Sequence, residues 1–138
     1  PEILMREFRK VHQFLSFTAH TPSQVALAAY LEQADTYLSL PAFYQEKRDY
    51  FLQQLLNLPF TLHHKTGGSY FQLLGYEQIS DMPDQEFARW MTKEIGVAVI
   101  PVSAFNHDGR DDKLIRICFA KKKETLDEAC LRMQKLLA

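Results

Sequence analysis

The chain has 138 residues, of which 46% are hydrophobic and 24% are charged, and its formal net charge is −1. This length and balance are typical of one soluble globular domain, and the near-neutral charge gives no reason to expect nucleic acid or a membrane surface as a partner. No apolar run reaches the roughly 18 residues of a membrane-spanning helix, and the two cysteines, Cys118 and Cys130, predict reduced, buried thiols in a cytoplasmic protein.

The first part of the chain predicts helices. Apolar residues of the N-terminal segment recur every three to four positions, which is the period of an amphipathic helix. Thr21 followed by Pro22 is a typical helix start, and Pro41 begins the next helix. The stretch before Thr21 is irregular and carries Phe17, a large aromatic residue outside helical packing. We therefore expect helices over residues 1–15, 22–35 and 41–56.

The second part of the chain predicts short strands between two further helices. Gly67 and Gly68 permit positive φ and separate two of these strands. Gly96 is placed to stop a helix that begins at Pro83, and the last helix begins with a capping-box pattern in which Glu128 follows Thr125 by three residues. The expected elements are strands over residues 60–64, 69–75, 97–102 and 114–120, and helices over residues 83–95 and 125–137.

This order of elements predicts an α+β domain. Its sheet is small, with about four strands, and helices cover one of its faces. The second face and the edges of such a sheet are left over, so another domain could cover them.

Arg116 is the most informative candidate for a functional residue. It lies in the otherwise apolar run 114–119, and the alternation of a strand places it on the face opposite Ile115 and Ile117. A lone buried charge is costly, so Arg116 must meet a carboxylate, a phosphate or water. Two interpretations stay open. Arg116 is either a structural cation, in an internal salt bridge or on an exposed edge strand, or a bidentate clamp for an anionic ligand.

Phe17 and the segment 67–71 are weaker candidates. Phe17 either fills a local hydrophobic gap or contacts a ligand or a second subunit. The glycine-aromatic segment is either a turn that enters a strand or part of a substrate pocket. Metal binding is not expected, because the five histidines are scattered and the adjacent His63 and His64 point to opposite faces of the predicted strand.

Two runs in the second half resemble the C-terminal domain of fold-type-I aminotransferases of classes I and II. The first is Gly96–Phe105, and the second, Leu114–Ala120, follows after a polar loop. In that family the arginine of the second run binds the α-carboxylate of the substrate, so the resemblance assigns this role to Arg116. The opening from Lys10 through Phe17 to Gln24 resembles the kynurenine and methionine aminotransferase branch.

The resemblance also implies further substrate-binding residues. In that branch the aromatic residue matching Phe17 reaches into the active site of the neighbouring subunit, and the adjacent Thr18 takes a place held by histidine in some relatives. The segment with Tyr70 and Phe71 resembles the family's glycine-aromatic segment that approaches the substrate side chain. Phe105 then bounds the same pocket.

The intact enzyme implied by the resemblance uses pyridoxal 5'-phosphate to transfer an amino group from a methionine-like or aromatic amino acid to a 2-oxo acid. In the family, the cofactor lysine and the groups that hold the cofactor lie upstream of the region matched here. We therefore expect a single C-terminal domain, with an interdomain helix and active-site loop over 1–20, a compact body over 21–138, and the large cofactor domain absent. Such a chain is expected to have no catalytic or cofactor-binding residue of its own and no activity alone.

The expected partners in the intact enzyme are the two substrates, the chain's own large domain and a second subunit. The alternative is a stand-alone α+β module that binds a small carboxylate through Arg116 or serves in an interaction. In an interaction module Arg116 would be salt-bridged and would affect stability alone.

Overall fold

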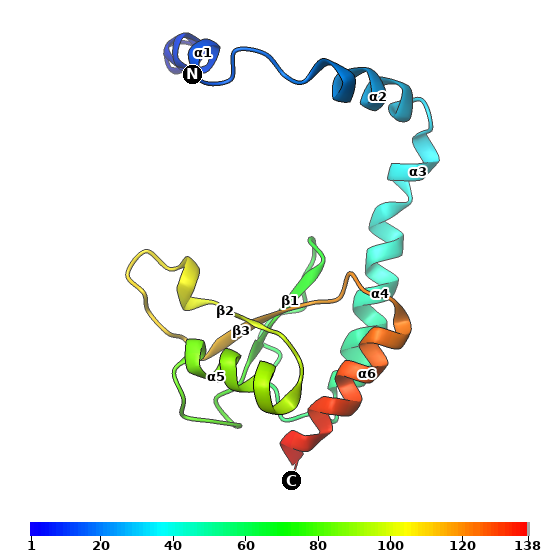
Figure 1. Cartoon of the computed structure of the whole chain (residues 1–138), viewed down its shortest axis with the longest axis vertical. Helices are drawn as coiled ribbons and strands as arrows, with labels where there is room; N and C mark the ends of the chain where they lie inside the picture. Colours follow the sequence, from blue (N-terminus) through cyan, green and yellow to red (C-terminus); the bar gives the residue numbers. More distant parts are fainter. Residues whose placement is uncertain (138) are drawn as a thin grey trace. The chain divides into compact units, whose positions relative to one another are not determined.

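The structure is a computed structural model that describes residues 1–137. The chain divides into two compact units, Pro1–Ser39 and a second unit that begins at Leu40. Figure 1 colours the first unit from blue to cyan and the second from cyan to red. The expected boundary between an interdomain segment over 1–20 and a body over 21–138 stays a prediction. Ala138, the last residue of that body, lies outside the described residues.

The first unit consists of three helices, α1 (Glu2–Leu15), α2 (Thr21–Leu31) and α3 (Ala34–Leu38). The helix expected over 1–15 is confirmed, whereas the helix expected over 22–35 ends four residues early and is followed by the separate short helix α3. None of the three helices buries a residue within the structure. Their apolar side chains, such as Phe8 and Leu15 on α1, are therefore exposed.

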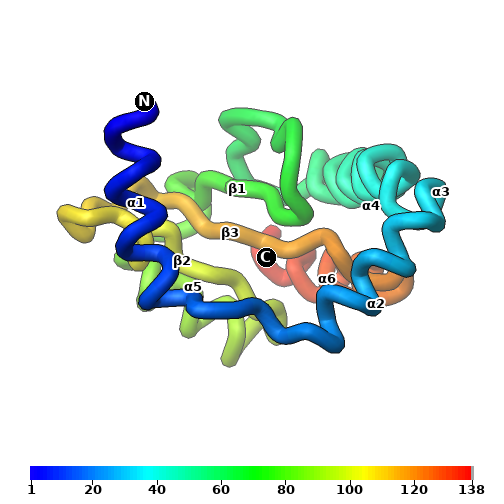
Figure 2. The backbone as a smooth tube through the Cα atoms, turned by 90° about the horizontal axis from the view of Figure 1, so that it is seen from above, coloured from blue at the N-terminus to red at the C-terminus, as the bar shows by residue number. Residues whose placement is uncertain are grey.

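The stretch between α1 and α2, drawn in blue in Figure 2, contains Phe17, which has an unusual backbone conformation. Its φ of 52° lies in the left-handed region, which is uncommon for a bulky residue because Cβ crowds the backbone there. The side chain is 89% exposed, so no packing within this unit explains the conformation.

The second unit contains a three-stranded antiparallel sheet of β1 (Phe71–Gly75), β2 (Ile100–Pro101) and β3 (Leu114–Cys118), in the order β1-β3-β2. Its helices are α4 (Leu40–Leu55), α5 (Asp84–Trp90) and α6 (Lys123–Met133), with single turns η1 (Met91–Ile95), η2 (Ser103–Phe105) and η3 (Gln134–Leu137). Helices α4 and α6 lie side by side (Figure 1). The expected α+β class is confirmed.

Every expected strand is shorter than the sequence pattern indicated. Strands β1 and β3 each lack two of the expected residues at one end, and the other two strands are reduced further. The segment 60–64 pairs with β1 only through the bridge between Thr61 and Gly75. Further along, the Gln72 side chain binds the His64 carbonyl and the Thr66 N–H, so these groups are not free to pair with β1. The strand expected over 97–102 is reduced to β2, in which Pro101 has no N–H for a longer ladder. The sheet therefore has three strands and an isolated bridge.

Two expectations about helix ends met different outcomes. Gly96 ends the α5–η1 helix with φ of 79°, as expected of a left-handed cap. The capping box at Thr125 is wrong, because α6 begins at Lys123 and the Thr125 N–H already donates to the Lys122 carbonyl inside the first turn. In the turn before β1, the residue with positive φ is Ser69, at 75°.

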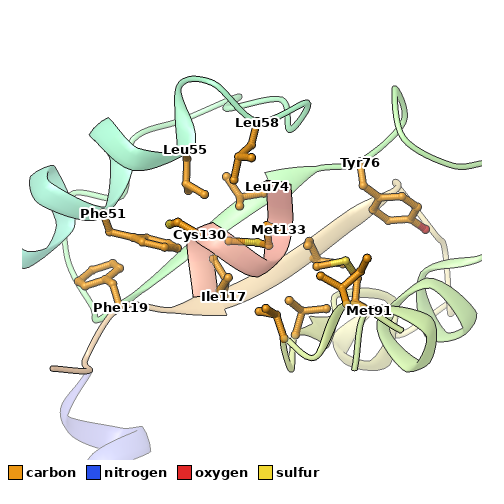
Figure 3. Close-up of a cluster of buried hydrophobic side chains, with 14 of the residues drawn as sticks. Phe51, Leu55, Leu58, Leu74, Tyr76, Met91, Ile117, Phe119, Cys130 and Met133 are labelled. Atoms are coloured by element: carbon orange, nitrogen blue, oxygen red, sulfur yellow. The ribbon is translucent and has the colours of Figure 1, made fainter. Parts of the chain in front are cut away.

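The core of the second unit lies between the helices and one face of the sheet (Figure 3). In its centre the rings of Tyr76 and Phe87 stack in parallel, with centroids 4.0 Å apart. Burial raises the pKa of the Cys130 thiol to about 11, so this cysteine stays protonated as expected for a structural residue. Core side chains labelled in Figure 3 include Phe51, Leu55, Leu74, Met91, Ile117, Phe119 and Met133.

The second face of the sheet is left partly open. Along β3, Ile115 and Ile117 are buried while Leu114, Arg116 and Cys118 are half-buried, which confirms the expected alternation. None of the helices in the described part of the chain is long and apolar enough to span a membrane.

Candidate functional site

Arg116 lies at the centre of the open face of the sheet. It is in the middle of β3, the central strand, directly opposite Leu73 on β1 and Ile100 on β2. Residues directly opposite in an antiparallel pair share a face, so these three side chains form a row across the sheet. Leu73 and Ile100 are 40% and 41% exposed, which makes the surroundings of the guanidinium apolar and accessible.

Two aromatic rings lie over the Arg116 guanidinium. Its Cζ is 4.4 Å from the centroid of the Phe71 ring and 4.9 Å from that of Phe105. Phe71 belongs to β1 and Phe105 to η2, which follows β2, so the two rings come from opposite sides of β3. Cation–π attraction to both rings holds the guanidinium in place without neutralising its charge.

Arg116 has no carboxylate partner among residues 1–137, unlike most of the other arginines of the second unit. Arg48, Arg110 and Arg132 each form an ion pair with an N···O distance between 2.7 and 3.0 Å. No hydrogen bond of the Arg116 side chain accompanies its two ring contacts in this part of the chain. An internal salt bridge is therefore excluded within the described residues, and the five N–H groups of the guanidinium are available to an external acceptor.

The third aromatic residue of the site is Tyr70, which extends the row of rings away from Arg116. Its ring meets that of Phe71 edge-on at 5.4 Å and lies 6.2 Å from Tyr44 of α4. The Tyr70 carbonyl accepts the N–H of Phe119 at 3.0 Å, so the β1–β3 pairing extends by one bond and fixes the backbone here. Tyr44 carried no signal of its own in the sequence, because it lies on an ordinary helical stripe.

Gln72 supports this aromatic segment from the core side, and the sequence pattern did not single it out. It is 1% exposed, accepts the Thr66 N–H at 3.1 Å and donates to the His64 carbonyl at 2.6 Å. Arg48 donates to the Thr66 carbonyl at 2.7 Å. Because the buried Gln72 side chain is hydrogen-bonded at both its oxygen and its nitrogen, it restricts the turn before Tyr70. The signal that could have revealed Gln72 was a polar residue at an inward position of β1.

The predicted site residues fall into two groups. Tyr70, Phe71, Phe105 and Arg116 come together on the second unit. Phe17 and Thr18 belong to the first unit, where Phe17 is exposed and the Thr18 hydroxyl donates weakly to the Ala19 carbonyl at 3.4 Å.

The group on the second unit can bind and orient a ligand. A planar cation between apolar side chains suits a carboxylate attached to an apolar or aromatic body. Proton transfer needs a titratable acid or base within reach of the reacting atom, and the phenyl rings of Phe71 and Phe105 carry no such group. No cluster of metal-ligating side chains occurs in residues 1–137.

Comparison with known proteins gives a consistent result. A family model described as aminotransferase class I and II matches residues 1–133. Methionine aminotransferase of Escherichia coli (strain K12) is 45% identical over 137 residues, which are 99% of this chain and 35% of that protein. Kynurenine–oxoglutarate transaminase 1 of Rattus norvegicus is 31% identical over 98% of this chain and 37% of its own length.

Solved structures agree with these relatives. The crystal structure of an Escherichia coli protein with an identified methionine aminotransferase function matches with a TM-score of 0.86 and 43% identity, over 98% of this chain and 35% of that one. N-succinyldiaminopimelate aminotransferase from Mycobacterium tuberculosis matches with a TM-score of 0.82 and 32% identity, over 99% and 36% of the two chains. The chain thus spans about a third of the length of the relatives it matches.

Proposed function

We propose, since this chain belongs to the class I and II aminotransferase family, that it is the part of a cytoplasmic aminotransferase that binds the substrate's α-carboxylate. The observation that carries the proposal is Arg116, a half-buried cation with two aromatic rings over it and no internal carboxylate. The reaction is transfer of an amino group from an amino acid to a 2-oxo acid. The apolar row around Arg116, together with the methionine and kynurenine aminotransferases among the relatives, favours methionine or an aromatic amino acid as the donor.

The cofactor implied by the family is pyridoxal 5'-phosphate, which when bound supplies the electron sink that makes the substrate Cα–H bond acidic. Its attachment requires a lysine amine, and the lysines with defined contacts here are otherwise engaged. Lys65 pairs with Asp49, while Lys47 and Lys113 donate to backbone carbonyls. The described side chains that gather around Arg116 include no lysine, so this site fits the substrate's carboxylate rather than the attachment of the cofactor.

The contribution of this chain to the reaction is binding and orientation. Two parallel N–H···O bonds from Arg116 fix both the position and the plane of the α-carboxylate. Phe71 and Phe105 reduce the access of water to that contact, which strengthens it. Holding the carboxylate in one orientation also fixes the direction of the Cα–H bond, and this lowers the entropic cost of reaching the transition state.

The experiment that tests this function uses the full product of the gene that encodes the chain. With pyridoxal phosphate, L-methionine and a 2-oxo acid, we expect the amino acid corresponding to that oxo acid to form, as detected by chromatography. L-Methioninamide is the matched control, because it keeps the side chain and amine but lacks the carboxylate, so its kcat/KM should be lower by about two orders of magnitude. Equal turnover of the two donors would refute the carboxylate clamp.

The 138-residue chain by itself is expected to show no transamination under the same conditions. Binding of methionine by this chain without pyridoxal phosphate would instead favour the stand-alone carboxylate-binding module, which the accessible Arg116 face also permits.

Phe17 and Thr18 are proposed to serve the active site of a second subunit. The support is the full exposure of Phe17 together with its left-handed backbone, because strained conformations persist where surroundings outside the local segment hold them. Mixed dimers of Phe17→Ala and Arg116→Met subunits test this arrangement. If Phe17 acts across the interface, each mixed dimer has one site with both residues intact, and an equal mixture should recover about a quarter of wild-type activity. Activity that stays at the mean of the two parent variants would mean that Phe17 serves its own subunit.

A further inference from the structure

Asp84 is a buried carboxylate that the substrate contacts do not use. It is the first residue of α5, and it is 2% exposed. Both of its oxygens bind the same residue: Oδ1 accepts the hydroxyl of Ser103 at 2.6 Å, and Oδ2 accepts the backbone N–H of Ser103 at 2.7 Å. Two short bonds from one residue to both oxygens of a buried side chain tie Ser103 firmly to α5.

Ser103 begins the single turn η2, and the turn ends with Phe105, whose ring lies over the Arg116 guanidinium. Phe105 is 63% exposed, so packing around the ring does little to hold it. Its position depends on the backbone of the turn. Two local bonds close this turn, from the Phe105 N–H to the Val102 carbonyl and from the Asn106 N–H to the Ser103 carbonyl, and a third joins it to β3 from the Val102 N–H to the Leu114 carbonyl. The bonds to Asp84 are what fix the turn to the helical layer.

A second carboxylate links Asp84 to the strand that carries Arg116. The Asp84 N–H donates to Asp111 Oδ2 at 2.9 Å, and Asp111 Oδ1 accepts the N–H of Lys113 at 2.8 Å, one residue before β3. Burial, with the charges of Asp111 and Asp84 nearby, raises the pKa of Tyr76, whose hydroxyl donates to the Met82 carbonyl at 2.9 Å. One hydrogen-bonded network therefore reaches from the start of α5 to η2 and to β3.

We infer that Asp84 is a positioning residue that acts through Ser103 to hold Phe105 over Arg116, and so sets the aromatic wall beside the bound carboxylate. The inference rests on the proposed role of Arg116 in substrate binding. Without the bonds to Asp84, the turn carrying Phe105 moves more freely, and water reaches the guanidinium from that side. Substrate binding then weakens, while chemistry on the substrate that does bind changes little.

The test uses Ser103→Ala, Phe105→Ala and the double variant in the full gene product. Ser103→Ala removes one of the two bonds to Asp84 and keeps the carboxylate satisfied by the remaining N–H, so the variant is expected to fold. We expect KM for methionine to rise about fivefold to tenfold in either single variant, with kcat within about twofold of wild type. The double variant should be no worse in KM than Phe105→Ala, because both changes act through the same ring.

Two further variants separate positioning from general destabilisation. Thr92→Val removes another hydroxyl bond to the backbone of the second unit, the one to the Ala88 carbonyl, and keeps the bonds of Asp84 to Ser103 and Asp111, so its KM should match wild type. Asp84→Asn keeps one oxygen that can accept the Ser103 N–H, and its new amide N–H can donate to the Ser103 hydroxyl oxygen. We therefore expect Asp84→Asn to keep a KM close to that of wild type and Asp84→Ala to raise it. Additive KM effects of Ser103→Ala and Phe105→Ala would overturn the inference.

A spectroscopic readout makes the inference independent of transamination. In the 138-residue chain labelled with 15N-arginine, the Arg116 Nε–H resonance should be shifted by the ring current of Phe105, and Ser103→Ala and Phe105→Ala should move it in the same direction. If Ser103→Ala lowers the thermal stability but leaves this resonance in place, Asp84 and Ser103 are structural residues and the inference is wrong. Failure of the proposed function would show differently, as an absence of amino transfer in every variant including wild type.

Discussion

Replacing Arg116 with methionine should lower kcat/KM for L-methionine by about two to three orders of magnitude in the full gene product. Methionine has a similar length and fits between Phe71 and Phe105 without charge, so the change removes the carboxylate contact and little else. Both binding and orientation are lost, and the decrease should therefore appear in kcat as well as in KM. Steady-state kinetics with methionine and a saturating 2-oxo acid measure the effect.

Three comparisons make the Arg116 result interpretable. Arg116→Lys keeps the charge but loses the planar guanidinium with its paired N–H groups, so its kcat/KM should lie between that of wild type and that of Arg116→Met. Arg132→Met removes a surface ion pair with Glu128 and should stay within about twofold of wild type. L-Methioninamide should be used equally poorly by wild type and Arg116→Met, because the partner of the arginine is already missing. A variant Arg116→Met with wild-type kinetics would show that the carboxylate binds elsewhere.

Phe87→Ala should lower the free energy of unfolding of the 138-residue chain by about 3–5 kcal/mol. The Phe87 ring is fully buried, lies in parallel on Tyr76 at 4.0 Å, and is 5.6 Å from Trp90. Its removal leaves a cavity beneath α5, where the surrounding rings cannot collapse fully. Urea unfolding followed by the fluorescence of Trp90, the single tryptophan of the chain, measures the change directly.

Phe14→Ala is the matched control for this prediction. Phe14 is on α1 and is 82% exposed, so the same chemical change should alter the free energy of unfolding by less than about 0.5 kcal/mol. An equal loss of stability in both variants would mean that burial in the second unit does not dominate the stability of the chain.

The local pattern of the sequence was sufficient for much of the fold and for the position of Arg116, the residue proposed to bind the substrate's carboxylate. The 3.6-residue period of residues 1–15 and the positive φ of Gly96 are set within a few positions of the chain, so helix α1 and the end of η1 were predicted correctly. Alternation along residues 114–119 placed Arg116 on the face opposite Ile115 and Ile117. Both kinds of signal depend on neighbours in sequence.

The errors in the fold have a common cause. In the segment where a strand was expected over 60–64, the Gln72 side chain binds the His64 carbonyl and the Thr66 N–H, so these backbone groups do not pair with β1. Gln72 lies eight residues after His64 in the chain. The strand expected over 97–102 was limited by Pro101 and by the short length of pairing available on β3. Periodicity reports which residues are apolar, but it does not report which backbone groups a polar side chain will bind.

The sequence by itself determined that Arg116 stands on an apolar strand, and its resemblance to the aminotransferases supplied a reason for the charge. The absence of an internal carboxylate within residues 1–137, the two rings over the guanidinium and the link from Asp84 through Ser103 were decided by tertiary structure. Phe71, Phe105 and Arg116 are separated by 11 to 45 positions in the chain, and Asp84 lies 19 positions before Ser103. Contacts over such separations depend on how the strands pair and how the helices pack, and no local pattern of residues encodes them.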